Sequence, residues 1–247
     1  MRNKTEILID IEQLDLKINE IDLLQSFSIK ILKEERVGIT GPSGCGKSTL
    51  LKSIINGVFP KNSNANKFFK DKNVQYSYVP QTNGLLPWYS LNRNLDIFKK
   101  DESLFVETIN KFKLNKCLNN FPHQLSGGEY QRSILASAII LKPNVFFADE
   151  PLTELDIVNK WEFLSFWSEK INQSNATLIL ISHDVDTLLY LCDRIIVLSD
   201  KPSQILKEFS VRVPHVRDVD FLVSEIFINS KKQLLESIQQ HKDYNFD

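Results

Sequence analysis

The feature that most constrains this chain is a glycine cluster inside the segment GITGPSGCGKSTLLKSI, at residues 38–54. The chain has only eight glycines, and four of them lie in this segment. The run before the cluster, RVGIT, predicts a buried strand, and the apolar spacing of Leu50, Leu51 and Ile54 predicts a helix after it. This order of strand, glycine loop and helix predicts an α/β fold.

The segment from Gly41 to Thr49 fits the phosphate-binding pattern G-x-x-x-x-G-K-[ST]. Phosphate oxygens need successive backbone N–H groups that face one concavity, where a side chain would block their approach. The following helix directs its positive dipole end at the same anion. Lys47 is expected to attract the outer phosphates, and the Ser48 hydroxyl to hold Mg²⁺.

A tight turn with positive φ angles is the alternative interpretation, but it explains one or two glycines and not the Lys-Ser pair. We expect Cys45 to be a small residue that fills the loop, with redox control as the alternative. The predicted nucleotide-binding residues in this loop are Gly41, Pro42, Ser43, Gly44, Cys45, Gly46, Lys47, Ser48 and Thr49.

A second glycine pair lies in LSGGEYQRSILASAIIL, at residues 125–141. Ser126 is suited to be an N-cap, and an apolar helix is expected after it. Gly127 and Gly128 would lie at the N-terminus of this helix, which would be the second helix end in the chain that attracts an anion. The alternative interpretation is an ordinary capped helix without a bound anion. One phosphate cannot easily use two such ends of one chain, so the pair indicates a site shared between two subunits.

Two further apolar runs end in polar residues. NVFFADEP, at residues 144–151, predicts a buried strand that ends at Asp149 and Glu150, and TLILISHD, at residues 177–184, predicts one that delivers His183. The carboxyl ends of parallel strands carry the site in α/β sheets. We expect Asp149 to hold Mg²⁺ through water, Glu150 to polarise the attacking water and His183 to contact the γ-phosphate, a structural histidine being the alternative.

Composition narrows the class of protein. Apolar residues make up 42% and charged residues 25% of the chain, which is typical of a globular protein with a core. The net charge of −1 argues against nucleic acid as the main partner. The three cysteines have neither disulfide nor zinc spacing and are expected to be reduced thiols. We expect neither a secretion signal nor a membrane-spanning run.

The motifs occur in a fixed order: GPSGCGKST, Gln81, LSGGEYQR, VFFADEP, LTELD and ISHD. This order resembles the nucleotide-binding subunit of ABC transporters, from about Ile7 to the end of the chain. Three stretches resemble the import ATPases of the nitrate, sulfonate and taurine group: LLPW after Gln81, PHQLSGG, and a tail that runs from DRIIVLSDKPSQI to VPHVRD.

The resemblance implies a P-loop NTPase (RecA-like) core with a parallel sheet, an N-terminal antiparallel β hairpin and an inserted helical subdomain. The ATPase domain would span residues 1–200. Its core would comprise residues 1–81 and 141–199, and its helical subdomain residues 82–140. Residues 201–247 would form a strand–helix extension packed on the core.

The resemblance also implies ATP hydrolysis with Mg²⁺ at a head-to-tail dimer. Gln81 would reach Mg²⁺ and the attacking water, although it could instead be a turn residue after Pro80. The residues expected to be catalytic are Lys47, Gln81, Glu150 and His183. Those expected to hold Mg²⁺ are Ser48, Gln81 and Asp149. Those expected to serve the nucleotide of the second subunit are Ser126, Gly127, Gly128 and Asp156.

The implied partners are a second nucleotide-binding subunit, integral membrane permease subunits and, indirectly, a solute-binding protein, with no nucleic acid. The chain would lie peripherally at the cytoplasmic face of the cell membrane and drive uptake of a small anion or organic nutrient. The alternatives are a soluble ABC-type ATPase that acts on nucleic acid or ribosomes, and a nucleotide-dependent regulator that does not hydrolyse ATP.

Three positions depart from the family pattern. Ile18 replaces the aromatic residue that stacks on adenine, which weakens the prediction of base selectivity. Glu34 replaces a glycine and suggests a different turn. Glu154 replaces a small residue in the interface loop, and we expect it to point outward or to pair with a basic residue.

Two other segments carry predictions. NGLLPWY, at residues 83–89, could pack the helical subdomain onto the core or line a groove for a helix of the membrane subunit. Near the end, residues 219–240 predict a helix in which Phe221, Ile226 and Phe227 belong to a buried stripe.

Overall fold

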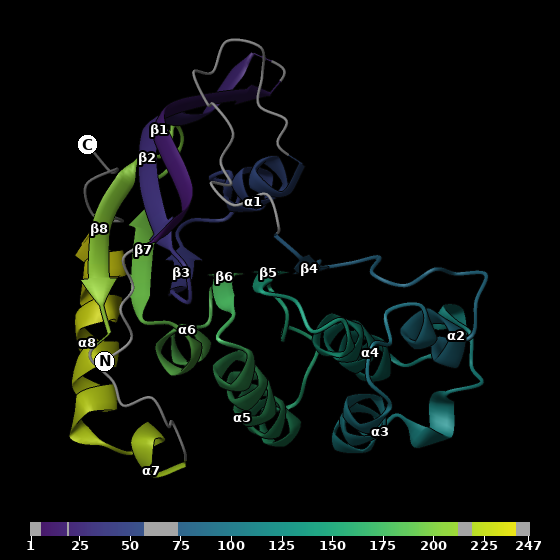
Figure 1. The fold of residues 1–247 in the computed structure, drawn as a ribbon. Coiled ribbons are helices and arrows are strands. Elements are labelled where there is room, and N and C mark those ends of the chain that lie inside the picture. Colours follow the sequence, from purple (N-terminus) through teal and green to yellow (C-terminus); the bar gives the residue numbers. More distant parts are fainter. Residues whose placement is uncertain (1–5, 19, 57–73, 212–218, 241–247) are drawn as a thin grey trace. The chain divides into compact units, whose positions relative to one another are not determined.

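The computed structural model describes residues 6–18, 20–56, 74–211 and 219–240. The chain divides into two compact units, one made of Met1–Val74 with Thr177–Asp247 and one made of Gln75–Ala176. They are called the first and the second unit below, and Figure 1 labels their helices and strands. No helix of the described ranges is both long and apolar enough to cross a membrane.

The first unit begins with the predicted antiparallel hairpin, strands β1 (Ile7–Ile18) and β2 (Ile21–Leu32). Along β1, Leu14 and Leu16 are buried while the residues beside them face solvent, the alternation of a strand with one covered face. At the end of the hairpin, Ile18 is 45% exposed.

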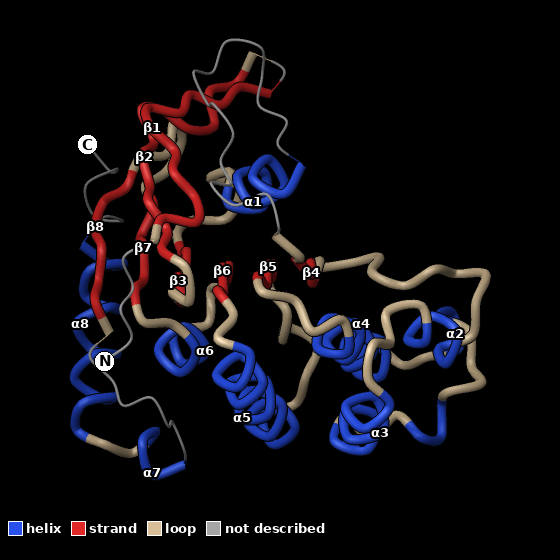
Figure 2. The backbone as a smooth tube through the Cα atoms, viewed as in Figure 1, coloured by secondary structure: helices blue, strands red, loops and turns tan. Residues whose placement is uncertain are grey.

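Four strands of the first unit lie in the order β6 (Thr177–Ile181), β3 (Arg36–Thr40), β7 (Arg194–Leu198) and β8 (Ile205–Ser210), and the first three form the parallel arrangement that the sequence predicts. Strand β3 pairs in parallel with β6 and with β7, whereas β8 is antiparallel to β7. Figure 2 colours these strands red. Every residue of β3 and β6 is buried, as is usual for parallel strands covered on both faces.

The described helices of the first unit are α1 (Lys47–Asn56), α6 (Val185–Leu191), α7 (Val219–Leu222) and α8 (Glu225–Gln240). Helix α8 lies alongside β8 in Figure 1, where Lys207 Nζ donates to Ser237 Oγ at 3.0 Å. It is also tied to α6, because Lys231 Nζ lies 2.6 Å from an Asp186 carboxylate oxygen.

The predicted buried stripe at the end of the chain is only partly right. Phe221 and Phe227 are buried and pack edge to face, with ring centroids 5.3 Å apart. Ile226, however, is 53% exposed, so its inclusion in the stripe is wrong. It immediately precedes Phe227, and neighbouring residues of a helix point in different directions.

The second unit contains the parallel strands β4 (Tyr76–Val79) and β5 (Val145–Asp149). Its α-helices are α2 (Leu91–Asp96), α3 (Glu102–Lys111), α4 (Gly127–Ile140) and α5 (Ile157–Ser174), with 3₁₀ turns at Asn115–Cys117 and Pro122–Gln124. Phe112 stacks on Phe163, with centroids 4.7 Å apart, and Trp167 is 1% exposed. The predicted helical stretch, residues 82–140, thus holds three of these helices, while the predicted domain boundaries stay a prediction.

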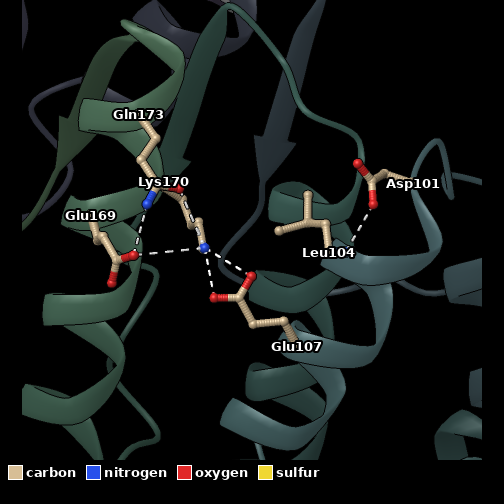
Figure 3. Close-up of polar contacts among 6 residues, drawn as sticks. All are labelled: Asp101, Leu104, Glu107, Glu169, Lys170 and Gln173. Atoms are coloured by element: carbon tan, nitrogen blue, oxygen red, sulfur yellow. Dashed lines mark hydrogen bonds and ion pairs between the residues drawn. The ribbon is translucent and has the colours of Figure 1, made fainter.

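Helices α3 and α5 are joined by a polar contact, shown in Figure 3. Lys170 Nζ on α5 donates to both carboxylate oxygens of Glu107 on α3, at 2.7 and 2.9 Å. The Lys170 side chain is only 12% exposed, which reduces the screening of this ion pair by water. Asp101 caps α3 by accepting a hydrogen bond from the Leu104 N–H at 3.0 Å.

The turn before β3 corrects one expectation. Glu34 has a φ of 61°, the left-handed conformation that glycine favours, so the glutamate does not create a different turn there. The Glu34 N–H donates to Thr177 Oγ1 at 2.8 Å. This long-range bond helps to hold a conformation that a residue with a β-carbon adopts at a cost.

Candidate functional site

The phosphate loop, defined as residues 41–46, connects β3 to α1 in the first unit, as predicted. Gly41, Gly44 and Gly46 have φ angles of 154°, 79° and 106°. A Cβ on Gly41 would lie 2.8 Å from the backbone oxygen of Leu198, a distance at which something must shift. The loop therefore requires glycine both for its backbone conformation and for its close approach to β7.

Lys47 is the first residue of α1 and is only 6% exposed. Its ammonium donates to the carbonyl oxygens of Gly41 and Pro42, at 2.8 and 2.7 Å. The loop thus combines a helix N-terminus with a buried positive charge, and both attract anions. These features fit a polyphosphate group.

His183 follows strand β6, which is parallel to β3, so it leaves the strands at the same edge as the phosphate loop. The Ser182 N–H donates to the Ile39 carbonyl at 3.2 Å. The Asp184 N–H donates to Ser182 Oγ at 3.1 Å, which forms a turn that leaves His183 exposed. The placement agrees with the predicted γ-phosphate contact, and the contact itself stays a prediction.

In the second unit, β4 and β5 end at one edge, because Val79 is paired with Ala148 in parallel register. Gln81, which is exposed, and the carboxylate pair that starts at Asp149 therefore leave the two strands on the same side. Asp149 is 2% exposed. Burial, together with the negative charge of Asp149, raises the pKa of the Tyr78 hydroxyl to about 12.

Glu150 has a φ of 49°, a left-handed conformation that is unusual for a residue with a β-carbon. Thr153 Oγ1 donates to the Glu150 carbonyl at 2.7 Å. Gln131, which is 3% exposed, donates from Nε2 to the Pro151 carbonyl at 2.6 Å. The backbone is thus held at the Glu150 and Pro151 carbonyls, by two residues that sequence reasoning missed.

The N-terminus of α4 has the predicted cap. The Ser126 hydroxyl accepts from the Glu129 N–H at 3.3 Å, and the Glu129 carboxylate accepts from the Ser126 N–H at 2.9 Å and from its hydroxyl at 2.8 Å. These bonds from Ser126 lower the pKa of Glu129. Gly127 and Gly128 form the first turn of this helix.

Glu154 does not behave as expected. It is exposed, but it neither points away from the candidate site nor forms the expected contact with a basic residue in the described part of the chain. Instead, Glu154 Oε2 lies 3.5 Å from the position that a Cβ on Gly127 would occupy. The carboxylate therefore faces the first turn of α4, where backbone N–H groups attract negative charge.

Asp156 caps helix α5, because its carboxylate accepts from the Asn159 N–H at 3.0 Å and from the Asn159 side-chain amide at 2.6 Å. The cap is a structural role. The predicted role of Asp156 in a subunit interface stays a prediction.

The described part of the chain offers few donors for Mg²⁺. Within the described ranges, no three or more His, Cys, Asp or Glu side chains are grouped so as to hold a metal. The Ser48 hydroxyl and the Asp149 carboxylate are hard oxygen donors, and Mg²⁺ in nucleotide sites takes few protein ligands together with phosphate oxygens and water. Each of these donors, taken within its own unit, is of the type that suits a metal arriving with a nucleotide.

The segment 83–90, called the aromatic loop below, is fixed by two buried or half-buried side chains. Asn94 is 1% exposed and accepts from the Leu86 N–H at 2.7 Å, while its amide donates to loop carbonyls. The Tyr130 hydroxyl on α4 accepts from the Gly84 N–H at 3.1 Å. The loop nevertheless leaves Trp88 65% exposed, which makes this loop a candidate contact surface.

Comparisons with known proteins agree with these features. The family model described as "ABC transporter" matches residues 24–153. The chain is 31% identical to an aliphatic sulfonates import ATP-binding protein SsuB from Zymomonas mobilis, over 89% of this chain and 94% of that protein. It is 28% identical to the protein of that name from Bacillus licheniformis, over 91% and 90%.

Solved structures show the same fold. A dimeric bacterial ABC transporter cassette aligns with a TM-score of 0.71 and 25% identity, over 84% of this chain and all of that one. A dimeric cassette in a post-hydrolysis state with ADP and Pi aligns with a TM-score of 0.70 and 23% identity, over the same shares.

Proposed function

Because the chain belongs to the ABC transporter family and is an ATP hydrolase, we propose that it is the ATP-binding subunit of an importer for a small anion or organic nutrient. The observation that carries the proposal is the phosphate loop, with three glycines at positive φ and the buried ammonium of Lys47. The sulfonate import proteins match about nine-tenths of the chain, which supports a solute of the nitrate, sulfonate or taurine class.

In this proposal the phosphate loop wraps the phosphates of ATP. Lys47 leaves the carbonyls of Gly41 and Pro42 to bind the outer phosphates, and the N-terminus of α1 adds its dipole. Ser48 and Asp149 would hold Mg²⁺, which would supply positive charge against the phosphates. His183 contacts the γ-phosphate.

Hydrolysis then depends mainly on position and charge, as phosphoryl transfer generally does. Glu150 polarises the water that attacks the γ-phosphate, and Gln81 helps to orient this water. The fixed backbone around Glu150 supports this role, because a general base must be held within hydrogen-bonding reach of its water.

A second copy completes the site. Ser126, Gly127 and Gly128 bind the γ-phosphate held by the partner, and Asp156 lies in the interface. This explains why one chain carries two anion-attracting helix ends. ATP joins the two copies because its phosphates bridge them, and hydrolysis removes the bridge.

The membrane partner would dock on the aromatic loop. Exposed aromatic side chains are enriched in protein interfaces, and Trp88 and Tyr89 are both exposed there. We therefore propose that permease subunits hold this chain at the cytoplasmic face of the membrane. A separate solute-binding protein would select the solute.

The test of this function is Glu150→Gln, which keeps the size of the side chain and removes its basicity. We expect phosphate release with Mg²⁺ and ATP to slow by at least about a hundredfold. The variant should still bind ATP and form dimers, measured by gel filtration with ATP. The exposed Glu225→Gln is the matched control, with normal turnover expected. A normal rate in Glu150→Gln would show that Glu150 is not the base.

A further inference from the structure

The segment between β7 and β8, residues 199–204, contains one fully buried hydroxyl that the mechanism above does not use. Ser203 is 0% exposed, although Lys201 and Gln204 on either side of it are exposed. A serine at full burial needs hydrogen-bond partners, because a buried polar group without them is costly.

Those partners lie on two other segments of the first unit. Ser203 Oγ donates to the Cys45 carbonyl of the phosphate loop at 2.6 Å. Its backbone N–H donates to the Leu23 carbonyl of β2 at 2.8 Å, and its own carbonyl accepts from the Gln25 N–H at 3.2 Å. One residue thus joins the phosphate loop to the hairpin.

The bond to Cys45 has a consequence for the next residue. In a trans peptide the carbonyl and the following N–H point in opposite directions. Holding the Cys45 carbonyl toward Ser203 therefore turns the Gly46 N–H away from Ser203. Gly46 has a φ of 106° and no side chain to restrain it, so this peptide group could rotate more easily than most.

Two distances show which groups lie beside the loop at this point. A Cβ on Gly46 would lie 3.4 Å from Leu23 Cβ, and a Cβ on Gly44 would lie 4.0 Å from Lys201 Nζ. The 199–204 segment thus approaches the phosphate loop with a hydroxyl and an ammonium.

We infer that Ser203 is a positioning residue for ATP binding, whose hydroxyl fixes the Cys45–Gly46 peptide group so that the Gly46 N–H faces the phosphates. The inference rests on the proposed function in one respect, namely that the phosphate loop is the ATP site. It assigns to a serine near the end of the chain a role in shaping a loop near its start.

The test compares Ser203→Ala with Ser199→Ala in the full-length chain. Both lose a hydroxyl in the same segment, but Ser199 Oγ makes its two hydrogen bonds within that segment, donating to the Asp200 carbonyl and accepting from the Gln204 N–H. The measurements are the Kd of a fluorescent ATP analogue with Mg²⁺, the KM and kcat of hydrolysis, and the melting temperature without nucleotide.

We expect Ser203→Ala to raise Kd and KM by about five- to tenfold, the effect of losing one hydrogen bond, and to change kcat by less than about twofold. Ser199→Ala should leave Kd unchanged. A normal Kd in folded Ser203→Ala, or an equal rise in both variants, would overturn the inference. If Ser203→Ala does not fold, Ser203→Cys is measured instead, because its thiol fills the space of the hydroxyl but is a weak hydrogen-bond donor. We expect Ser203→Cys to raise Kd as well, and a normal Kd in this variant would also overturn the inference.

Lys47→Ala separates this inference from the proposed function. If Lys47→Ala weakens ATP binding and Ser203→Ala does not, only the role of Ser203 fails. If Lys47→Ala also binds ATP normally, the phosphate loop is not the ATP site and the proposed function fails.

Discussion

At the scale of single residues, backbone strain lies at Glu150, the proposed catalytic carboxylate. Glu150, at a φ of 49°, occupies a region that costs a non-glycine residue roughly 1–2 kcal/mol. Such a conformation persists only where the surroundings enforce it. Here the enforcing groups are the Thr153 hydroxyl and the Gln131 amide.

Thr153→Val should therefore impair turnover more than stability. The variant keeps the shape of an exposed side chain but loses the hydroxyl that bonds to the Glu150 carbonyl. We expect kcat to fall by about three- to tenfold, because one hydrogen bond that fixes the base is lost, with little change in ATP affinity. Steady-state phosphate release measures this. Thr153→Ser, which retains the hydroxyl, should behave as wild type, and equal losses in both variants would refute the explanation.

At the scale of elements, helix α4 connects three functional segments of the second unit. Its N-terminus holds Ser126, its first turns carry Tyr130 toward Gly84, and Gln131 reaches Pro151. The aromatic loop and the backbone beyond Glu150 are thus bonded to one rigid helix. If the proposed membrane partner displaces the loop, it would move the helix that carries the proposed second anion-binding end.

Asn94→Ala should loosen the aromatic loop. Asn94 is buried and accepts from the Leu86 N–H, and it donates to three loop carbonyls. We expect a loss of about 2–3 kcal/mol in the free energy of unfolding and faster hydrogen exchange at the Leu86 amide. Hydrogen-exchange mass spectrometry measures the second effect. The control is Asn92→Ala, an exposed position on the same helix, and unchanged exchange in Asn94→Ala would contradict the assignment.

At the scale of the whole molecule, the proposed site requires two copies of the chain. Each copy contributes the N-terminus of its α4 to the nucleotide site of the other. Such an arrangement predicts complementation between variants that are damaged in different halves of the site. Lys47→Ala removes the phosphate-loop charge. Gly128→Asp places a carboxylate at the α4 end, where its Cβ has room, with the Arg132 guanidinium at 3.4 Å and the Glu154 carbonyl oxygen at 3.7 Å.

Each variant alone should hydrolyse little ATP. An equal mixture should recover about a quarter of the wild-type rate, because half of the dimers are mixed and each of these holds one intact site. Phosphate release before and after mixing measures the recovery. A mixture no more active than its separate components would contradict a site shared between copies.

Several structural features could be predicted from the sequence by itself, because each depends on residues that are close together in the chain. The phosphate loop was predicted because glycine φ angles and the step from strand to helix depend on about ten neighbouring residues. The α4 cap and the buried strand β5, whose apolar run ends at Asp149, were predicted for the same reason. The wrong expectations, at Glu34, Glu154 and Ile226, concern what a side chain or turn meets in three dimensions.

Only the tertiary structure decided which groups support the site. Ser203 bonds to a loop 158 residues earlier in the chain, and Gln131 bonds to a carbonyl 20 residues later. Neither residue stands in a pattern that predicts its partner, because a hydrogen bond between distant segments depends on how the strands and helices pack. The local pattern determined that this chain has a phosphate loop, and the packing determined what holds the loop in shape.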